Sequence, residues 1–267
     1  MMHSIHPLPD APSVSPVPSI PPGQRVYAVG DIHGRLDLFE ALIAAIEEDD
    51  AAARQARTTV ILLGDLIDRG PDSAGVIARA RHWRRQREVR ILGGNHEEMF
   101  LLGMEDRDVL RHFLRFGGRE TLLSYGVQPS LRDSPKELKA LQVLMKERIP
   151  PEDIAFIRGF EEMIEIGGYA FVHAGILPDV PLEDQSAKDL RWIREPFLSH
   201  AGHHSHVIVH GHTISRRAEL RENRIGIDTG AFVSGRLTAL VLEGAERGLI
   251  EAKEEDGRTA ITASKVG

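Results

Sequence analysis

The sequence predicts an α/β fold with a largely parallel sheet in its first half and a mostly β layer in its second half. Three observations lead to this fold. Short apolar segments alternate with helically spaced segments as far as about residue 95, a helical stretch follows, and strand-like segments dominate from residue 163 onward. With 267 residues, of which 42% are hydrophobic and 27% charged, the chain is long enough for one sizeable domain.

The expected domain limits follow from composition at the two ends. Seven prolines between residues 7 and 22 favour extended, solvated chain, so we expect residues 1–24 to form a disordered leader, with a proline-rich docking arm as the alternative. The folded domain is expected over residues 25–255. Residues 256–267 are expected to form a flexible tail.

Composition also excludes several classes of protein. The chain has no cysteine, so disulfide frameworks and thiolate metal sites are excluded. The start of the chain lacks a basic segment followed by an apolar run, and no apolar run approaches a membrane span, which favours a cytoplasmic protein without membrane partners. A net charge of −7 argues against general nucleic-acid affinity.

The expected elements can be placed in chain order. A strand at 25–30 precedes a helix at 35–57, whose apolar residues recur every three or four positions. A strand at 58–64, a helix at 73–88 and a strand at 89–94 come next. The helical stretch from about 97 to 160 is interrupted at Gly117–Gly118 and Pro150–Pro151, and the remaining strands are expected at 163–168, 169–175, 206–211, 224–230 and 237–244.

Polar side chains follow the first three strands, where each strand ends. Asp31 and His33 follow the first strand, Asp65 the second, and Asn95 and His96 the third. The successive motifs start 34 and 30 residues apart, which is about the length of one βαβ unit. Because loops at the carboxyl ends of parallel strands line one crevice, these side chains should converge.

Later strands can add histidines to the same place. His173 follows the strand at 169–172, and His210 and His212 follow the strand at 206–209. Without cysteine, these groups make an oxygen-and-nitrogen cage for divalent metals, with Mn²⁺ the first choice and iron or zinc as alternatives. The middle carboxylate, Asp65, can bridge two ions. Asp31 and Asp65 taken singly could equally be helix N-caps, but the whole set favours a two-metal site.

The segment "VILLGDLIDRGPDS" (60–73) adds groups suited to phosphate chemistry. Two divalent ions, two aspartates and one hydroxide leave a charge of about +1, which favours an anionic substrate. Arg69 can bind a phosphate with two hydrogen bonds. His96 can protonate the departing oxygen, with Asp68 holding its ring.

At these motifs the chain resembles a known family. "GDIHG" (30–34), "GDLIDRG" (64–70), "GNHE" (94–97), "HAG" (173–175) and "HGHT" (210–213) resemble the calcineurin-like metallophosphoesterases. The Asp-Arg-Gly ending of the second motif is similar to the phosphoprotein phosphatases, in particular the bacterial and phage-type Ser/Thr phosphatases. The resemblance spans about residues 25–235. It implies a central β-sandwich of mixed sheets flanked by helices, with the active site at the carboxyl ends of the strands.

The resemblance also implies roles for single residues. One metal would be held by Asp31, His33 and Asp65, and the other by Asp65, Asn95, His173 and His212. Asn95 and Arg69 would also bind the substrate phosphate. "IDTGA" (227–231) and "LRWIREP" (190–196) look familial too, and the latter suggests Arg194 as a second phosphate-binding arginine.

Two positions depart from the family pattern. His210 is not a ligand in that pattern, and we expect it to be a hydrogen-bonded strand-end histidine. Some members place a further histidine where this chain has Ile214. The first metal is therefore expected to have an open coordination position that water fills.

The sequence therefore predicts a binuclear metallophosphoesterase, first of all a protein Ser/Thr phosphatase acting on phosphoserine or phosphothreonine. A metal-bridging hydroxide would attack phosphorus directly, with His96 as the general acid. A bis(5'-nucleosyl)-tetraphosphatase or other nucleotide phosphohydrolase is the main alternative, and the Asp68–Arg69–Gly70 segment favours the phosphoprotein reading. An inactive phospho-binding module and a nuclease are weaker alternatives. The physiological substrate and the oligomeric state stay open.

Overall fold

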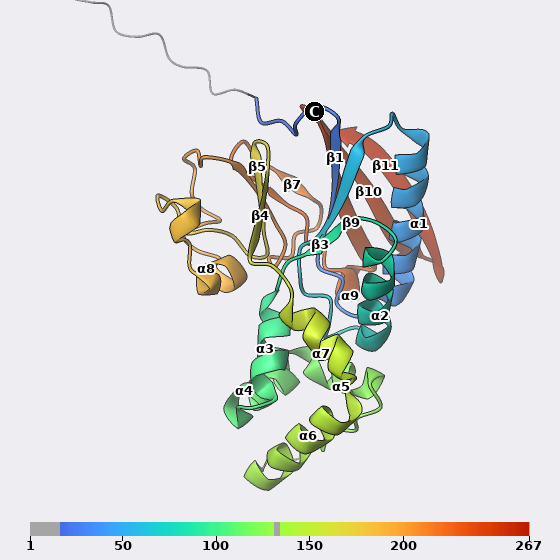
Figure 1. The fold of residues 1–267 in the computed structure, drawn as a ribbon, viewed down its shortest axis with the longest axis vertical. Helices are drawn as coiled ribbons and strands as arrows, with labels where there is room; N and C mark the ends of the chain where they lie inside the picture. Colours follow the sequence, from blue (N-terminus) through green and yellow to red (C-terminus); the bar gives the residue numbers. More distant parts are fainter. Residues whose placement is uncertain (1–16, 131–133, 267) are drawn as a thin grey trace, which may run out of the picture.

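The computed structural model describes residues 17–130 and 134–266, and within them two β-sheets pack face to face with helices around them (Figure 1). The first sheet has six strands in the order β11-β10-β9-β1-β2-β3. The first three strands in the chain run parallel, and the last three run antiparallel. The bounds are Gln24–Val29 (β1), Arg57–Leu62 (β2), Val89–Ile91 (β3), Arg236–Glu243 (β9), Glu246–Glu255 (β10) and Arg258–Val266 (β11).

The second sheet has five strands in the order β4-β5-β6-β8-β7. Its three middle strands, β5, β6 and β8, run parallel, and the two edge strands run antiparallel to their neighbours. The bounds are Met163–Ile166 (β4), Tyr169–Val172 (β5), Val207–His210 (β6), Glu219–Leu220 (β7) and Arg224–Gly226 (β8). The mixed sandwich flanked by helices confirms the predicted fold.

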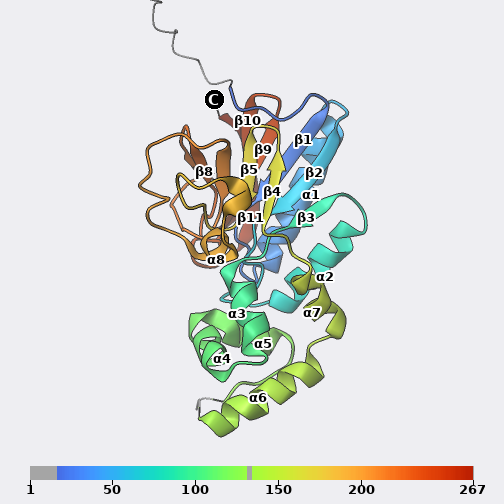
Figure 2. The ribbon, with the colours of Figure 1, turned by 60° about the vertical axis from the view of Figure 1, so that its left-hand side comes forward.

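Helices cover the outer face of the first sheet and gather below both sheets in the view of Figure 1. Figure 2 shows α6 as the helix farthest from the sheets. The bounds are Leu36–Ala52 (α1), Ser73–Arg84 (α2), Asn95–Gly103 (α3), Arg107–Phe113 (α4), Arg119–Ser124 (α5), Pro135–Arg148 (α6), Pro151–Arg158 (α7), Ala187–Trp192 (α8) and Ala231–Ser234 (α9).

The core has two main layers, which alternate along each central strand. In β1, Tyr27 and Val29 pack toward the helices, whereas Val26 and Ala28 pack toward the second sheet. This alternation follows from the two-residue period of a strand, and both faces are apolar because both are covered. A smaller apolar cluster around Phe197 covers the outer face of the second sheet.

The predicted breaks in the helical stretch are confirmed. A π-helical turn over Leu114–Gly118 separates α4 from α5, with Gly117 at a φ of 108°. Proline stands at the first position of α7, where its missing N–H costs nothing. Two predicted helices end early, because α1 stops at Ala52 and α2 at Arg84.

Both predicted chain ends need correction. Residues 256–267 were expected to be a flexible tail, but Arg258–Val266 forms β11 and pairs along its whole length with β10. The leader prediction over 1–24 lies partly outside the described residues. Within them, Ile20 is 1% exposed and its N–H bonds to the Gly244 carbonyl at 2.8 Å, so the packed chain begins before residue 25.

The described residues contain no helix with the length and apolar character that crossing a membrane would need.

Candidate metal centre

The predicted ligands meet where the loops after β1, β2, β5 and β6 approach the start of α3. The segments come from both sheets, which the sandwich brings together at one end. All of the predicted ligand side chains are buried, and none is more than 8% exposed: Asp31, His33, Asp65, Asn95, His173 and His212. Buried groups of this kind need partners, since unpaired polar atoms are costly away from water.

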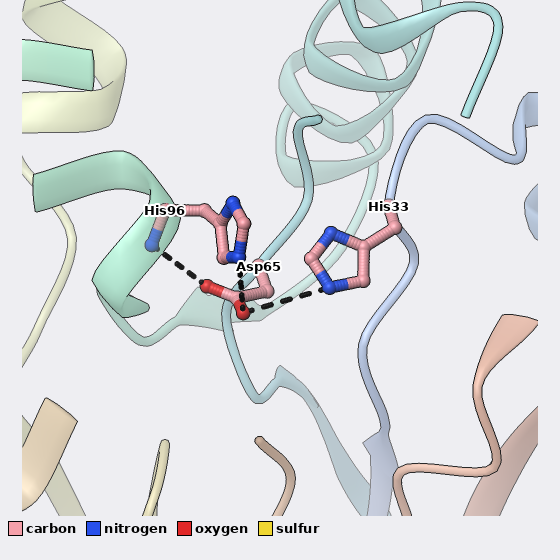
Figure 3. A group of neighbouring side chains, drawn as sticks. All are labelled: His33, Asp65 and His96. Carbon is pink, nitrogen blue, oxygen red and sulfur yellow. Dashed lines mark hydrogen bonds and ion pairs between the residues drawn. The ribbon is translucent and has the colours of Figure 1, made fainter. Parts of the chain in front are cut away.

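One three-residue group with metal-ligand spacing contains His33, Asp65 and His96 (Figure 3). Its ligand atoms all lie within 4.8 Å of one another. The His33 Nε2 atom is 3.6 Å from one Asp65 oxygen, Oδ2, and the His96 Nε2 atom is 3.9 Å from the same oxygen. Asp65 thus stands between an imidazole from the loop after β1 and one from the first turn of α3.

A second group shares the same aspartate and contains Asp65, His173 and His212. The His173 Nε2 atom is 3.5 Å from the other Asp65 oxygen, Oδ1. Each Asp65 oxygen therefore faces a different group, which is the arrangement that a bridging carboxylate needs. Burial by itself would raise the pKa of Asp65, but the four surrounding histidines hold it below its usual range, so the carboxylate is ionised.

Hydrogen bonds to backbone carbonyl groups fix which ring nitrogen carries the proton in two histidines, His33 and His173. The Nδ1 atom of His33 lies 2.7 Å from the Ile67 carbonyl oxygen, and that of His173 lies 2.8 Å from the Leu63 carbonyl oxygen. A carbonyl only accepts, so each Nδ1 carries the proton and donates it. Each Nε2 atom is left with a lone pair, as in a metal-binding histidine.

The remaining donors also fit a cation. The Nε2 atom of His212 is buried and has no hydrogen-bond partner among the described residues, and burial lowers the pKa of His212 to about 3. Burial likewise lowers the pKa values of His33 and His173, so these imidazoles are neutral. The Asn95 Oδ1 atom lies 3.1 Å from the His173 Nε2 lone pair, so two acceptors face each other. A divalent ion between such groups would satisfy both.

Asp31 lies in the site but outside both three-residue groups. Its two oxygens accept the backbone N–H of His212 at 3.1 and 3.0 Å. Burial, and then the nearby carboxylates Asp228 and Asp65, raise the pKa of Asp31 well above its usual value. Its role as a ligand stays a prediction, with the carboxylate already buried beside the Asp65 group.

The backbone around the site is strained. Five non-glycine residues in the site loops have left-handed φ angles between 45° and 74°: His33, Asp65, Asp68, Arg69 and His212. Each such residue costs about 1–2 kcal/mol, and such costs concentrate at functional sites. Glycine is required at position 94, because a Cβ there would lie 2.1 Å from the Asp65 Oδ1 atom.

Glu97 binds the backbone of the loop after β2 and of the turn before α3. No role was assigned to it from the sequence. Its carboxylate accepts the backbone N–H groups of Asp65, Leu66 and Gly94 at 2.9, 2.7 and 3.0 Å. Burial raises the pKa of Glu97 to about 7, and the Asp65 charge adds to the effect. Its place in "GNHE" was the only sequence signal for it.

Asp68 and His96 form the predicted pair. The His96 Nδ1 atom lies 2.6 Å from the Asp68 Oδ2 atom, and Thr121, which has no motif, donates its hydroxyl to the other oxygen, Oδ1, at 2.5 Å. Burial alone would lower the pKa of His96, but the Asp65 charge and the Asp68 hydrogen bond outweigh it and raise the pKa. A protonated His96 can therefore face the centre as an acid.

The two candidate arginines differ in setting. Arg69 donates from Nη1 to the His33 Nε2 atom at 2.7 Å, and its guanidinium lies 4.8 Å from the ring centre of Phe232. Arg194 is exposed and close enough for its charge, after burial, to lower the pKa of His212. Arg69 thus contacts a ligand residue directly, whereas Arg194 acts on the site only through its charge.

His210 lies outside both ligand groups. Its Nε2 atom accepts from the Arg224 guanidinium at 3.2 Å, and its Nδ1–H donates to the Gly211 carbonyl at 3.1 Å. The expectation of a hydrogen-bonded strand-end histidine is confirmed. Phe232 and Asp228 are further site neighbours without predicted roles, although Asp228 lies within the "IDTGA" segment.

Comparison with known proteins agrees with this geometry. The family model for calcineurin-like phosphoesterases matches residues 24–228. The serine/threonine-protein phosphatase 1 of Salmonella typhimurium is 30% identical, over 80% of this chain and 90% of its own. The asymmetrical bis(5'-nucleosyl)-tetraphosphatase PrpE of Anoxybacillus flavithermus is 27% identical over 79% and 88%, and the symmetrical enzyme of Nitrosospira multiformis is 26% identical over 82% and 92%.

Solved structures show the same fold. The cold-active protein-tyrosine phosphatase of a psychrophilic Shewanella species superposes with a TM-score of 0.53 at 20% identity, covering 96% of this chain and 86% of its own. With the two ligand groups, the Asp68–His96 pair and the matched family model, the chain belongs to the calcineurin-like phosphoesterases, a family of metal-dependent hydrolases.

Proposed function

We propose that this chain hydrolyses phosphate monoesters at a two-metal centre and that its substrate is a phosphorylated serine or threonine of a protein. The observation that carries the proposal is the position of Asp65 between His33 on one side and His173 and His212 on the other, beside the Asp68–His96 hydrogen bond. Mn²⁺ is the first candidate for both sites, with iron and zinc as alternatives, because the donors are oxygen and imidazole nitrogen.

The proposed ligand sets are those implied by the family pattern. One metal would be held by Asp31, His33 and Asp65, and the other by Asp65, Asn95, His173 and His212. When bound, two such ions supply Lewis acidity toward the phosphate oxygens and make water a better nucleophile. No phosphoenzyme is needed.

Arg69 and Arg194 would bind the phosphate. Arg69 donates to the His33 Nε2 lone pair, which is the same lone pair that a metal would take. Metal binding would therefore release the Arg69 guanidinium, whose planar fork matches two phosphate oxygens. The ring of Phe232 would keep the released guanidinium near the centre.

The leaving group supports a phosphoprotein substrate. A serine or threonine side chain departs as an alkoxide and needs a proton, which His96 can supply while Asp68 holds its ring. A nucleotide departing from a dinucleoside polyphosphate leaves through a phosphate oxygen with a pKa of about 6, which gains little from a proton. A buried, oriented acid is thus more useful against an ester of an alcohol.

Hydrolysis of dinucleoside tetraphosphates is the second candidate function. It is favoured by the bis(5'-nucleosyl)-tetraphosphatases among the relatives. Aromatic rings near Arg69 also favour it. Phe232 lies against the guanidinium, and Phe116, which is 47% exposed, precedes Gly117, whose carbonyl accepts the Arg69 backbone N–H. Such rings could stack on a nucleobase.

The test compares two substrates with two variants. Metal-stripped protein is re-supplied with Mn²⁺, and phosphate release is measured from a phosphothreonine peptide and from diadenosine tetraphosphate. We expect the peptide to be preferred, and H96Q to lower the peptide rate by about 10²–10⁴-fold. H206Q, which changes a histidine outside the site, is the matched control.

Each other outcome has a definite meaning. Preference for the dinucleotide, with little effect of H96Q, would replace the first candidate by the second. Release from neither substrate, with Mn²⁺ bound, would refute both enzymatic proposals and leave a phosphate-binding module.

A further inference from the structure

Asp228 has a buried carboxylate oxygen that no N–H or hydroxyl group of the described residues satisfies, and the carboxyl group of Asp31 lies next to it. The residue follows β8 and is 1% exposed. Its Oδ1 atom accepts the Gly230 N–H at 2.9 Å, whereas its Oδ2 atom is buried without a hydrogen-bond partner. An aspartate that only stabilises a turn needs the hydrogen bond from the Gly230 N–H to Oδ1 and no partner for Oδ2. The second oxygen is costly to bury unless a further group binds it.

The side chain lies against the predicted ligand Asp31. Among the charged neighbours of Asp31, Asp228 raises the pKa of Asp31 the most, and Asp65 follows. The backbone is closely packed here, because a Cβ at Gly30 would fall 2.4 Å from the Ile227 carbonyl oxygen and 3.5 Å from the Asp228 Cα. A Cβ at Gly211 would fall 2.0 Å from the Asp31 Oδ1 atom. Three buried carboxyl groups thus come together, and such a group needs either a shared proton or a cation to offset the like charges.

Ile214 and Asp228 are connected through one turn. A Cβ at Gly230 would lie 3.0 Å from the Ile214 Cγ2 atom, so Ile214 packs on the turn that carries Asp228. The Asp228 carbonyl also accepts the Ser215 N–H at 3.0 Å. The residue that departs from the family's histidine pattern is therefore adjacent to the unpartnered carboxylate.

We propose that Asp228 is a further ligand of the first metal, together with Asp31, His33 and Asp65, and that its Oδ2 atom fills the coordination position that Ile214 leaves open. The three carboxylates would then balance most of the charge of two divalent ions, so a bound hydroxide would bring the centre close to neutral. Attraction of an anionic substrate would depend correspondingly more on Arg69 and Arg194. The proposal rests on the metal centre of the proposed function, but not on its substrate.

The test measures metal directly, without substrate. Wild-type protein and the D228N, D228A and D184N variants are stripped and titrated with Mn²⁺ by calorimetry, with the bound metal counted by elemental analysis. Wild type and D184N, which changes an exposed aspartate, should bind two ions. D228N and D228A should keep one ion and bind the other about 10–100-fold more weakly. The paramagnetic resonance spectrum should change from that of a coupled ion pair to that of a single ion.

A rescue variant separates ligation from folding. I214H in the D228N background should restore binding of the second ion, because it supplies an imidazole from the loop that packs on the Asp228 turn. If D228N does not fold, D228A and the double variant give the same comparison. Unchanged binding of two ions by folded D228N or D228A would overturn the role of Asp228. Failure of the wild type to bind Mn²⁺ would instead refute the metal centre of the proposed function.

Discussion

Replacing Glu97 with alanine should destabilise the metal-free protein by about 3–5 kcal/mol. The Glu97 carboxylate accepts three short backbone hydrogen bonds, from Asp65, Leu66 and Gly94, at 2.9, 2.7 and 3.0 Å. Each buried N–H left without an acceptor costs about 1–3 kcal/mol, or about 3–9 kcal/mol together. Water entering the vacated space would accept hydrogen bonds from some of these N–H groups. The expected loss of stability therefore lies in the lower half of the range of about 3–9 kcal/mol.

Glutamine at this position separates acceptor geometry from charge. E97Q can still accept from Leu66, but its amide NH₂ would face the N–H groups of Asp65 and Gly94, donor against donor. We expect a loss of about 2–4 kcal/mol, from two unsatisfied donors. The same change should weaken metal binding by about 10–100-fold, because the loop that carries Asp65 loses its support.

The assay is urea unfolding followed by circular dichroism in the presence of EDTA. The measurement is made at pH 8, above the pKa of Glu97, which burial raises to about 7, so the wild-type carboxylate is ionised. E147A, which changes an exposed glutamate of α6, is the control and should stay within about 0.5 kcal/mol of wild type. An E97A or E97Q protein as stable as wild type would refute the assigned role of the carboxylate.

Three further predictions follow from the site. D68N should lower kcat by about 10–100-fold at little change in KM, since His96 loses the acceptor that orients its ring; equal kcat for D68N and wild type would refute this. Excess Mn²⁺ should raise the Tm measured in EDTA by about 5–10 °C for each bound ion, because a ligand at 100 times its Kd adds about 2.7 kcal/mol per site; an unchanged Tm would speak against a metal centre. Burial lowers the pKa of His210 to about 3, so the unfolded chain takes up the proton first, and the stability present above about pH 6.5 should be lost as the pH falls toward 3. H210Q should weaken this dependence, and parallel curves for the two proteins would contradict it.

The sequence predicted which side chains would come together better than it predicted the ends of the fold. The residues at the ends of β1 and β2 could be found because a parallel sheet brings such ends together, and the spacing of the motifs reports that sheet; those at the ends of β5 and β6 come from the second sheet, which packs against it. Histidine and aspartate at these positions are recognisable from the sequence as candidate metal ligands. His33 and Asp65 were found for this reason.

The last strands were missed because their stability is not local. Most residues of β11 are exposed, so the segment Arg258–Val266 lacks the apolar alternation of a half-buried strand. Its pairing with β10 makes it a strand, and that partner is visible only in three dimensions. Ile20 was missed likewise, because one buried residue among prolines has no period to reveal it.

Supporting residues were missed for a different reason. Thr121 lies 53 positions from Asp68, in a helix without a motif, and only the packed structure brings its hydroxyl to that carboxylate. Asp228 and Glu97 lay inside quoted motifs, but their contacts are to backbone and to other acids. Sequence spacing does not report such contacts.

The strand order has a consequence for the newly made chain. β1 pairs on one side with β2, which follows soon after it, but on the other side with β9, whose first residue is Arg236. At about 5–20 residues per second, a ribosome needs about 10–40 s between these two strands. During that time β1 has an open edge, and the loops that carry His33 and Asp65 lack the second sheet that brings His173 and His212 to them. The full set of predicted ligands can therefore come together only after nearly the whole chain has been synthesised.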